Sequence, residues 1–187
     1  MKCSVYIATS ADGYIANLEG GVDWLHSAGN PNVDMSANPD MGFNQFITSV
    51  DCMIMGRRTM EAIANFKLTE SQWPYGNIPI YAISKTTMEA PTSLLGKVKI
   101  YQDELAELLL MLENKGYQHI YIDGGSLITS CINLKKVNQM TITKAPVLLG
   151  QGIPLFGQLN TPIKLTDSKA VSFPNGFIQT TYQVDYS

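Results

Sequence analysis

The hydrophobic residues of this chain fall into short runs that are separated by polar turns. Six runs are predicted to be strands: Cys3–Ala8, Cys52–Met55, Ile78–Ser84, Val98–Tyr101, His119–Ile122 and Val137–Thr143. Several of them are apolar at nearly every position, which is typical of strands covered on both faces of a parallel sheet. Two later runs, Lys164–Ala170 and Phe177–Val184, are also predicted strands, and the second alternates polar with apolar residues. That alternation favours an antiparallel edge region.

Helical spacing appears between these strands. Apolar residues recur at i, i+3, i+4 and i+7 over 43–50 and again over 105–112, and Gly116 is placed to cap the second helix. Two shorter helices are expected after Thr59 and Ser126. Strands alternating with helices predict an α/β protein whose single, mainly parallel sheet is flanked by helices and ends in a C-terminal antiparallel hairpin. We expect one domain over residues 1–187.

Composition excludes several classes of function. The chain has 187 residues, 45% of them hydrophobic and 16% charged, and a net charge of −3. This balance gives no general attraction for nucleic acid or an anionic membrane, so any anion site must be local. The three cysteines and two histidines show no metal-ligand spacing, so no metal site or disulfide framework is expected, and a reducing cytoplasm fits better. No run approaches the roughly 18 apolar residues that a membrane span needs.

Two strand-to-helix turns carry the most informative chemistry. One is Gly56-Arg57-Arg58-Thr59, and the other is Asp123-Gly124-Gly125-Ser126. A helix start offers free backbone N–H groups and the positive end of the helix dipole, which together bind phosphate. Two such turns suggest a ligand with separated phosphates, such as a dinucleotide. The alternative is a solvated arginine pair beside a helix cap and a glycine pair that merely reverses the chain.

Further candidates lie outside these turns. Ser84-Lys85-Thr86 ends another strand and could supply a cation and hydroxyls to a ribose 2′-phosphate, although an exposed lysine in a turn is the commoner situation. Asp40 precedes the 43–50 helix, where helix capping explains it about as well as catalysis does. A partly buried carboxyl there would have a raised pKa and could relay protons near neutrality. Trp24 and Phe43 could wall an aromatic ligand, although core packing is the commoner role.

Several segments, in order, resemble the dihydrofolate reductase superfamily, and within it the C-terminal reductase domain of bifunctional riboflavin biosynthesis proteins. The matching segments are Ser10-Ala11-Asp12-Gly13-Tyr14-Ile15-Ala16, Asp51 through Gly56-Arg57-Arg58-Thr59, Pro79 through Ser84, Asp123-Gly124-Gly125, and Pro146 through Phe156. The ordered set is far more specific than any single motif. It identifies the chain as a stand-alone member of the family, because no His-x-Glu with Pro-Cys-x-x-Cys marks a deaminase domain.

The resemblance implies an NADPH-dependent reductase and assigns roles to residues. The pyrophosphate and the 2′-phosphate would be held by Gly56, Arg57, Arg58, Thr59, Ser84 and Lys85. The second helix would bind the pyrophosphate through Gly124, Gly125, Ser126, Leu127 and Ile128. The backbone of Ala8 and the side chain of Ile15 would flank the nicotinamide, and residues 16–24 would form a loop that closes over it. Relatives of this kind commonly form homodimers.

The substrate stays open at this point. The spacing in dihydrofolate reductases makes Asp40 the candidate for assisting protonation. Riboflavin-pathway reductases usually carry Lys after the Asp-Gly pair, and this chain has Tyr14. One hypothesis is therefore a reductase of a small pterin or pyrimidine, with dihydrofolate and the ribosylaminopyrimidine of riboflavin synthesis as candidates. The other is a nucleotide-binding protein that kept the cofactor cleft without efficient turnover.

Overall fold

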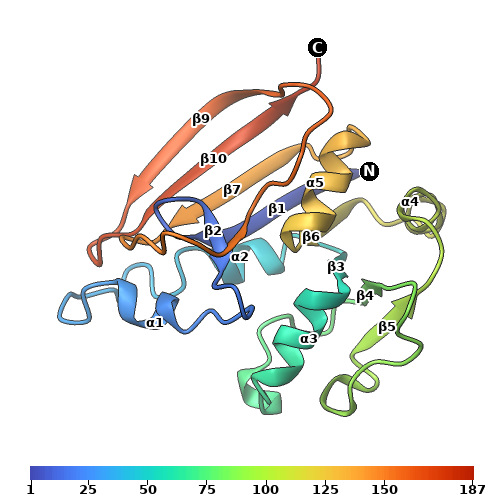
Figure 1. The fold of residues 1–187 in the computed structure, drawn as a ribbon, viewed down its shortest axis with the longest axis horizontal. Helices are drawn as coiled ribbons and strands as arrows, with labels where there is room; N and C mark the ends of the chain where they lie inside the picture. Colours follow the sequence, from blue (N-terminus) through green and yellow to red (C-terminus); the bar gives the residue numbers. More distant parts are fainter.

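An eight-stranded sheet forms the centre of the protein, with the strand order β5-β4-β3-β6-β1-β7-β10-β9 (Figure 1). The computed structural model describes all of residues 1–187. Six strands run parallel: β1 (Lys2–Thr9), β3 (Cys52–Gly56), β4 (Ile80–Ile83), β5 (Val98–Tyr101), β6 (His119–Asp123) and β7 (Gln139–Lys144). The hairpin of β9 (Lys164–Ser172) and β10 (Ile178–Asp185) completes the sheet in antiparallel fashion. The predicted α/β fold with a C-terminal antiparallel hairpin is confirmed.

Helices cover the parallel part of the sheet on both faces. One face packs against α4 (Leu105–Asn114) and α5 (Gly125–Asn133), and the other against α2 (Phe43–Ile47) and α3 (Arg57–Asn65). Within β3, Ile54 belongs to the first core and Met53 and Met55 to the second, and all three are fully buried. This explains why the strand is apolar at successive positions. Each such side chain contributes about 1.5–3 kcal/mol on burial.

The remaining helices are short. They are α1 (Trp24–Ala28) and two 3₁₀ turns, η1 (Glu70–Gln72) and η2 (Thr92–Leu94). No helix combines the length and the apolar character that crossing a bilayer requires.

Two local features differ from the sequence expectation. Helix α2 ends at Ile47 instead of Val50, because the hydroxyls of Thr48 and Ser49 donate to carbonyl oxygens one turn back. Such bonds compete with the helical pattern and end the helix early. Helix α1 lies within residues 20–39, a segment whose richness in Gly, Asn and Pro predicts a long loop without a helix.

A small second sheet pairs β2 (Tyr14–Ala16) with β8 (Ile153–Pro154). The carboxylate of Asp12 fixes this pairing, because it accepts the N–H groups of Leu149 at 3.2 Å and Gly150 at 2.7 Å. These bonds join two of the family-like segments, which are 138 positions apart. Asp12 therefore has a structural role. The sequence could not predict it, because strands as short as β2 and β8 leave no recognisable pattern.

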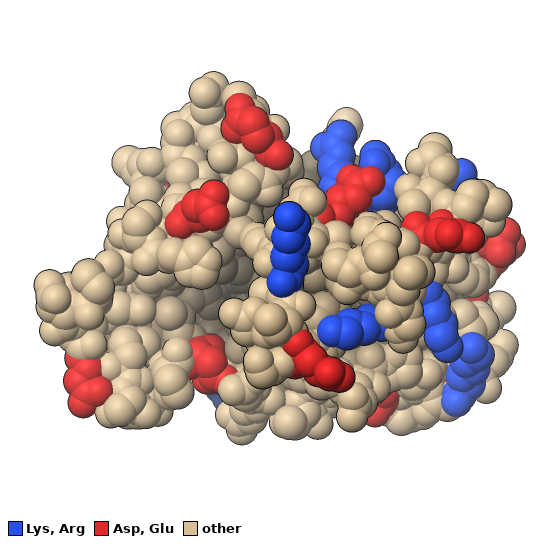
Figure 2. Space-filling view, turned by 90° about the horizontal axis from the view of Figure 1, so that it is seen from below, with Lys and Arg blue, Asp and Glu red and all other residues tan.

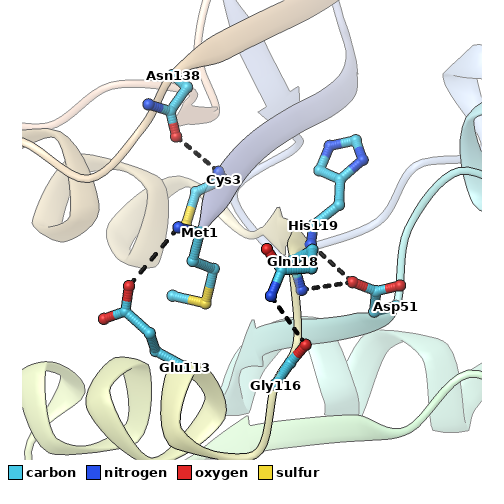
Figure 3. A network of polar contacts seen from close by, with 8 residues as sticks. All are labelled: Met1, Cys3, Asp51, Glu113, Gly116, Gln118, His119 and Asn138. Carbon is cyan, nitrogen blue, oxygen red and sulfur yellow. Dashed lines mark hydrogen bonds and ion pairs between the residues drawn. The ribbon is translucent and has the colours of Figure 1, made fainter.

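The amino-terminal edge of the sheet is held by side chains (Figure 3). Oδ2 of Asp51 accepts the backbone N–H groups of Gln118 at 2.6 Å and His119 at 2.7 Å. The ring of His119 bridges the carbonyl of Ser49 and the hydroxyl of Ser4, each at 2.8 Å. Two further contacts tie the first strand: the Met1 amino group with Glu113 at 3.6 Å, and the Cys3 N–H with Asn138 at 2.7 Å.

Candidate functional site

The carboxyl-terminal ends of four strands lie side by side, and they carry the predicted phosphate-binding residues. Gly56 at the end of β3 is in register with Ile83 of β4, which in turn is in register with Tyr101 of β5. On the other side of β3, Met55 is in register with Asp123 of β6. Since neighbouring strands are about 4.8 Å apart, the turns that follow them form one continuous rim.

The two glycine turns touch each other at this rim. Gly124 has φ of +99°, and a Cβ built there would lie only 2.5 Å from Oγ1 of Thr59 and 3.7 Å from the backbone nitrogen of Gly56. Glycine is therefore required at position 124 for both its conformation and its close approach to α3. A Cβ at Gly56, in contrast, would meet no atom within 4 Å. The surface above Gly56 is open to a ligand.

Both helices that start at this rim lack a side-chain cap. Neither α3 nor α5 has a hydrogen bond from the side chain of its N-cap residue, which is a glycine in both cases. The first-turn N–H groups thus keep their donor capacity and the dipole its positive end. Two amides among the predicted ligands are exceptions. That of Ile128 already donates to the carbonyl of Gly124 at 2.9 Å, and that of Gly124 donates to Oδ1 of Asp123 at 2.8 Å. Ser126 is exposed, whereas the side chain of Leu127 is buried in the core.

Ile15 and the start of α5 are also in contact. A Cβ at Gly125 would lie 3.2 Å from Cδ1 of Ile15 and 2.8 Å from the carbonyl oxygens of Pro154 and Leu155. The small sheet β2–β8 therefore packs directly on the second glycine turn. The structure brings Ile15 and the glycine turns together, and Ala8 lies on β1 opposite Thr143 of β7.

The predicted cations of the rim mostly have carboxylate partners. Nη1 of Arg57 pairs with Glu61 at 2.7 Å, and Nζ of Lys85 pairs with Glu104. Arg58 is exposed and makes no ion pair.

Ser84 is buried, and its hydroxyl is already engaged in the turn that follows β4. Its Oγ accepts the N–H groups of Thr87 at 2.9 Å and Thr86 at 3.3 Å. Of the residues expected at the 2′-phosphate, two cations and one hydroxyl thus already have partners within the protein.

Asp123 is a candidate that the sequence analysis treated only as part of a turn. Burial raises the pKa of its carboxyl to about 6, although the Gly124 N–H donates to Oδ1 at 2.8 Å and opposes the shift. Tyr121 lies two positions earlier on the same face of β6, and its ring packs against Phe43 and Phe46 of α2. The available signal was a carboxylate at the end of an otherwise buried strand, where desolvation makes protonation near neutrality possible.

Asp40 behaves in the opposite way. Its two carboxylate oxygens accept the N–H groups of Gly42 at 3.0 Å and Asn44 at 2.8 Å. These bonds lower the pKa of Asp40, so the expectation of a raised pKa at this position is wrong. The physical reason is that hydrogen bonds to the charged form outweigh the partial burial. The catalytic role of Asp40 stays a prediction.

The two predicted aromatic walls belong to different clusters. The ring of Phe43 lies 5.6 Å from that of Tyr6 and 6.5 Å from that of Tyr121, in edge-on contacts. Trp24 packs beside the separate cluster of Phe173 and Phe177, and its Nε1 is buried without a hydrogen-bond partner in the protein. Phe43 therefore lies on the same side of the sheet as Asp123 and Tyr121.

Two cavities, with volumes of about 190 and 390 Å³, lie elsewhere, between α4 and α5. They share Ala106 and Leu134, and none of the predicted site residues lines them. No three His, Cys, Asp or Glu side chains gather in a group able to hold a metal ion. The glycine rim remains the arrangement best suited to a ligand, since its donors and its open surface coincide.

Comparisons with known proteins show the family and the fold of this chain. The family described as the RibD C-terminal domain matches residues 2–179. The chain is 30% identical over 173 residues to the uncharacterized protein YwjB of Bacillus subtilis, covering 88% of this chain and 87% of that protein.

Solved structures give the same picture. A crystal structure from Shewanella sp. PV-4, of a protein that its name ties to riboflavin biosynthesis, has a TM-score of 0.86 and 37% identity, with 99% of both chains covered. The dihydrofolate reductase of Enterococcus faecalis, complexed with NADP(H), has a TM-score of 0.63 at 16% identity, over 98% of this chain and 96% of that one. This second likeness concerns the fold.

Proposed function

The chain belongs to the RibD C-terminal domain family, and on this basis we propose that it is an NADPH-dependent reductase of a small heterocyclic substrate. Family membership supports a reductase of the riboflavin-pathway type. The observation that carries the proposal for this chain is the contact between its two glycine turns. Thr59 lies against Gly124, and the surface above Gly56 is open.

The residues of the rim fit a dinucleotide. Two uncapped helix starts on adjacent strands offer N–H donors to two phosphates of a pyrophosphate. Gly56, Thr59 and Gly124 would hold these phosphates, while Ile15 and the backbone of Ala8 would flank the nicotinamide. When bound, the cofactor supplies the hydride, and the protein supplies orientation and a site that excludes water.

Asp123 is the better candidate for the proton donor, because it lies at the end of β6 beside the second glycine turn and burial raises the pKa of its carboxyl. Its pKa of about 6 leaves a fraction of the carboxyl protonated near neutrality, whereas that of Asp40 is lowered. A general acid works best when its pKa lies near the working pH. We assign the proton to Asp123 and give Asp40 the task of fixing the start of α2.

The proposed substrate class rests on the aromatic side chains that lie on the same side of the sheet as Asp123. The half-buried rings of Tyr6 and Phe43 lie on this side, beside the buried ring of Tyr121, and suit a flat heterocycle. Dihydrofolate, a related pterin and 5-amino-6-(5-phosphoribosylamino)uracil are the candidates. Tyr14 weighs against the phosphoribosyl substrate.

A second candidate function is NADP(H) binding without efficient turnover. The lowered pKa of Asp40 favours it, because the carboxyl expected from the dihydrofolate reductase spacing is a poor acid here. A screen of NADPH oxidation against the candidate substrates separates the two functions. Asp123→Asn is expected to abolish turnover while leaving cofactor affinity unchanged.

Replacing Gly56 by Ala tests the cofactor site directly. The new methyl group enters open space in the free protein, so we expect an unchanged melting temperature. A phosphate resting on the turn would clash with it, and NADPH affinity should fall about tenfold or more. Titration of NADPH fluorescence measures the affinity.

Gly157→Ala serves as the matched control, because its Cβ would meet Thr129 of α5 at an ordinary 3.6 Å, one helical turn beyond the second glycine turn. This variant should bind NADPH as the parent does. Equal affinity of the Gly56 variant and the parent would contradict the proposed site.

We also propose that a second copy of the chain covers the C-terminal hairpin. Leu165, Val171 and Ile178 on β9 and β10 are 39%, 51% and 49% exposed, and β9 is a free sheet edge. These side chains lie on an otherwise largely polar hairpin, and a second copy that pairs with the free edge of β9 would cover this edge together with part of the apolar surface. Sedimentation should give a dimer, and Val171→Lys should give a folded monomer. A monomeric parent protein would contradict this assignment.

A further inference from the structure

The ion pair between Lys85 and Glu104 joins two neighbouring strand ends at the rim. Ile83 and Tyr101 are in register, and the Ser84 N–H donates to the Tyr101 carbonyl at 3.0 Å, which extends the pairing. Lys85 comes directly after Ser84, and Glu104 comes three positions after Tyr101. The paired strand ends therefore bring the two side chains together, although they are 19 positions apart in sequence. The pair therefore depends on the fold and not on local spacing.

The other ion pair at this rim differs in origin. Arg57 and Glu61 are separated by four positions on α3, so helical geometry alone places them together. On the face drawn in Figure 2, the Lys and Arg side chains lie mainly in the right half, with Asp and Glu side chains among them. The rim thus offers a 2′-phosphate cations that are already partly neutralised.

We propose that Glu104 is a specificity-determining residue that limits the preference of this site for NADPH over NADH. The inference rests on the proposed function, since it concerns the cofactor of the same site. Glu104 pairs with the ammonium group of Lys85 and so places a negative charge beside the lysine that the family resemblance assigns to the 2′-phosphate. A carboxylate can accept a hydrogen bond from a ribose 2′-hydroxyl, but its negative charge repels a 2′-phosphate.

The expected effect is modest because the pair faces solvent. The side chains of Lys85 and Glu104 are 65% and 68% exposed. Coupling between exposed charges is worth less than about a fivefold change in affinity and is weakened by salt. Glu104 therefore reduces the preference for NADPH without abolishing it.

Dissociation constants of NADPH and NADH for the full chain test the inference. Glu104→Gln should raise the affinity for NADPH about three- to fivefold and change that for NADH less than about twofold. Lys85→Ala should weaken NADPH binding, and in its background the Glu104→Gln substitution should have no further effect. The gain should shrink as salt concentration rises.

Glu107→Gln is the matched control, because it removes the same charge from α4 and Glu107 makes no ion pair. An equal gain for this variant, or an unchanged NADPH-to-NADH ratio for Glu104→Gln, overturns the inference. If the parent chain binds neither dinucleotide, the proposed function itself fails, which the titration shows before any variant is made.

Discussion

The amino-terminal edge of the sheet is tied by side chains, whereas the carboxyl-terminal edge is formed by glycine turns whose helices lack caps. At the first edge, Asp51 accepts two backbone N–H groups and the His119 ring bridges two segments. At the second, Gly56 and Gly124 precede helices with no side-chain cap. Both edges belong to the same buried strands, so packing alone does not explain the difference.

The difference follows from the direction of the chain. In a parallel sheet with crossover helices, every helix start faces the carboxyl-terminal edge, and its free N–H groups and dipole gather there. Donors left unused by the protein are available to a ligand. At the amino-terminal edge the backbone N–H groups of Gln118 and His119 are already bonded to the carboxylate of Asp51, so they are not available to a ligand.

Among the variants that test the difference between the two edges, Gly125→Ala should have the largest effect. Its Cβ would lie 2.8 Å from the carbonyl oxygens of Pro154 and Leu155, so the small sheet must move off α5. We expect a loss of about 2–4 kcal/mol in unfolding free energy. NADPH affinity should also fall, because Ile15 moves with the small sheet. Chemical denaturation and fluorescence titration measure the two effects.

Asp51→Ala at the opposite edge is the counterpart of that variant. It removes the acceptor of two backbone N–H groups, and because Asp51 is exposed we expect a cost of about 1 kcal/mol. Cofactor affinity should be unchanged. A comparable loss of binding in this variant would show that the two edges are not independent.

Sequence reasoning predicted the fold better than it predicted the site. Strand β5 was predicted at its observed bounds, and Gly116 has the positive φ of a helix cap, because apolar spacing and glycine conformation are local signals. The contact of Thr59 with Gly124 joins residues 65 positions apart, and no local pattern contains it. The partners of Lys85 and the burial of Asp123 are likewise tertiary properties. Candidate residues could therefore be named from the sequence, whereas their partners and their burial could not, and their roles stay predictions.

The two edges should also respond to pH with opposite signs. At the carboxyl-terminal edge, burial raises the pKa of Asp123 from 3.8 to about 6, so its contribution to stability is present below pH 3.8 and is lost as pH rises through about 6. At the amino-terminal edge, burial lowers the pKa of His119 from 6.5, so its contribution is present above pH 6.5 and is lost as pH falls.

Replacing each group by its neutral analogue separates these two effects. Above pH 7, Asp123→Asn should raise the unfolding free energy by up to about 3 kcal/mol and the melting temperature with it. Near pH 4 it should have no effect. The parent protein should lose a smaller amount of stability as pH falls below 6.5, because His119 becomes protonated. His119→Gln should remove this loss and leave the stability above pH 6.5 unchanged. Thermal unfolding across this pH range measures both. A parent-like pH profile for Asp123→Asn would mean that the carboxyl is ionised without cost in the folded protein. It would then not be a proton donor near neutrality, and the catalytic assignment would return to Asp40.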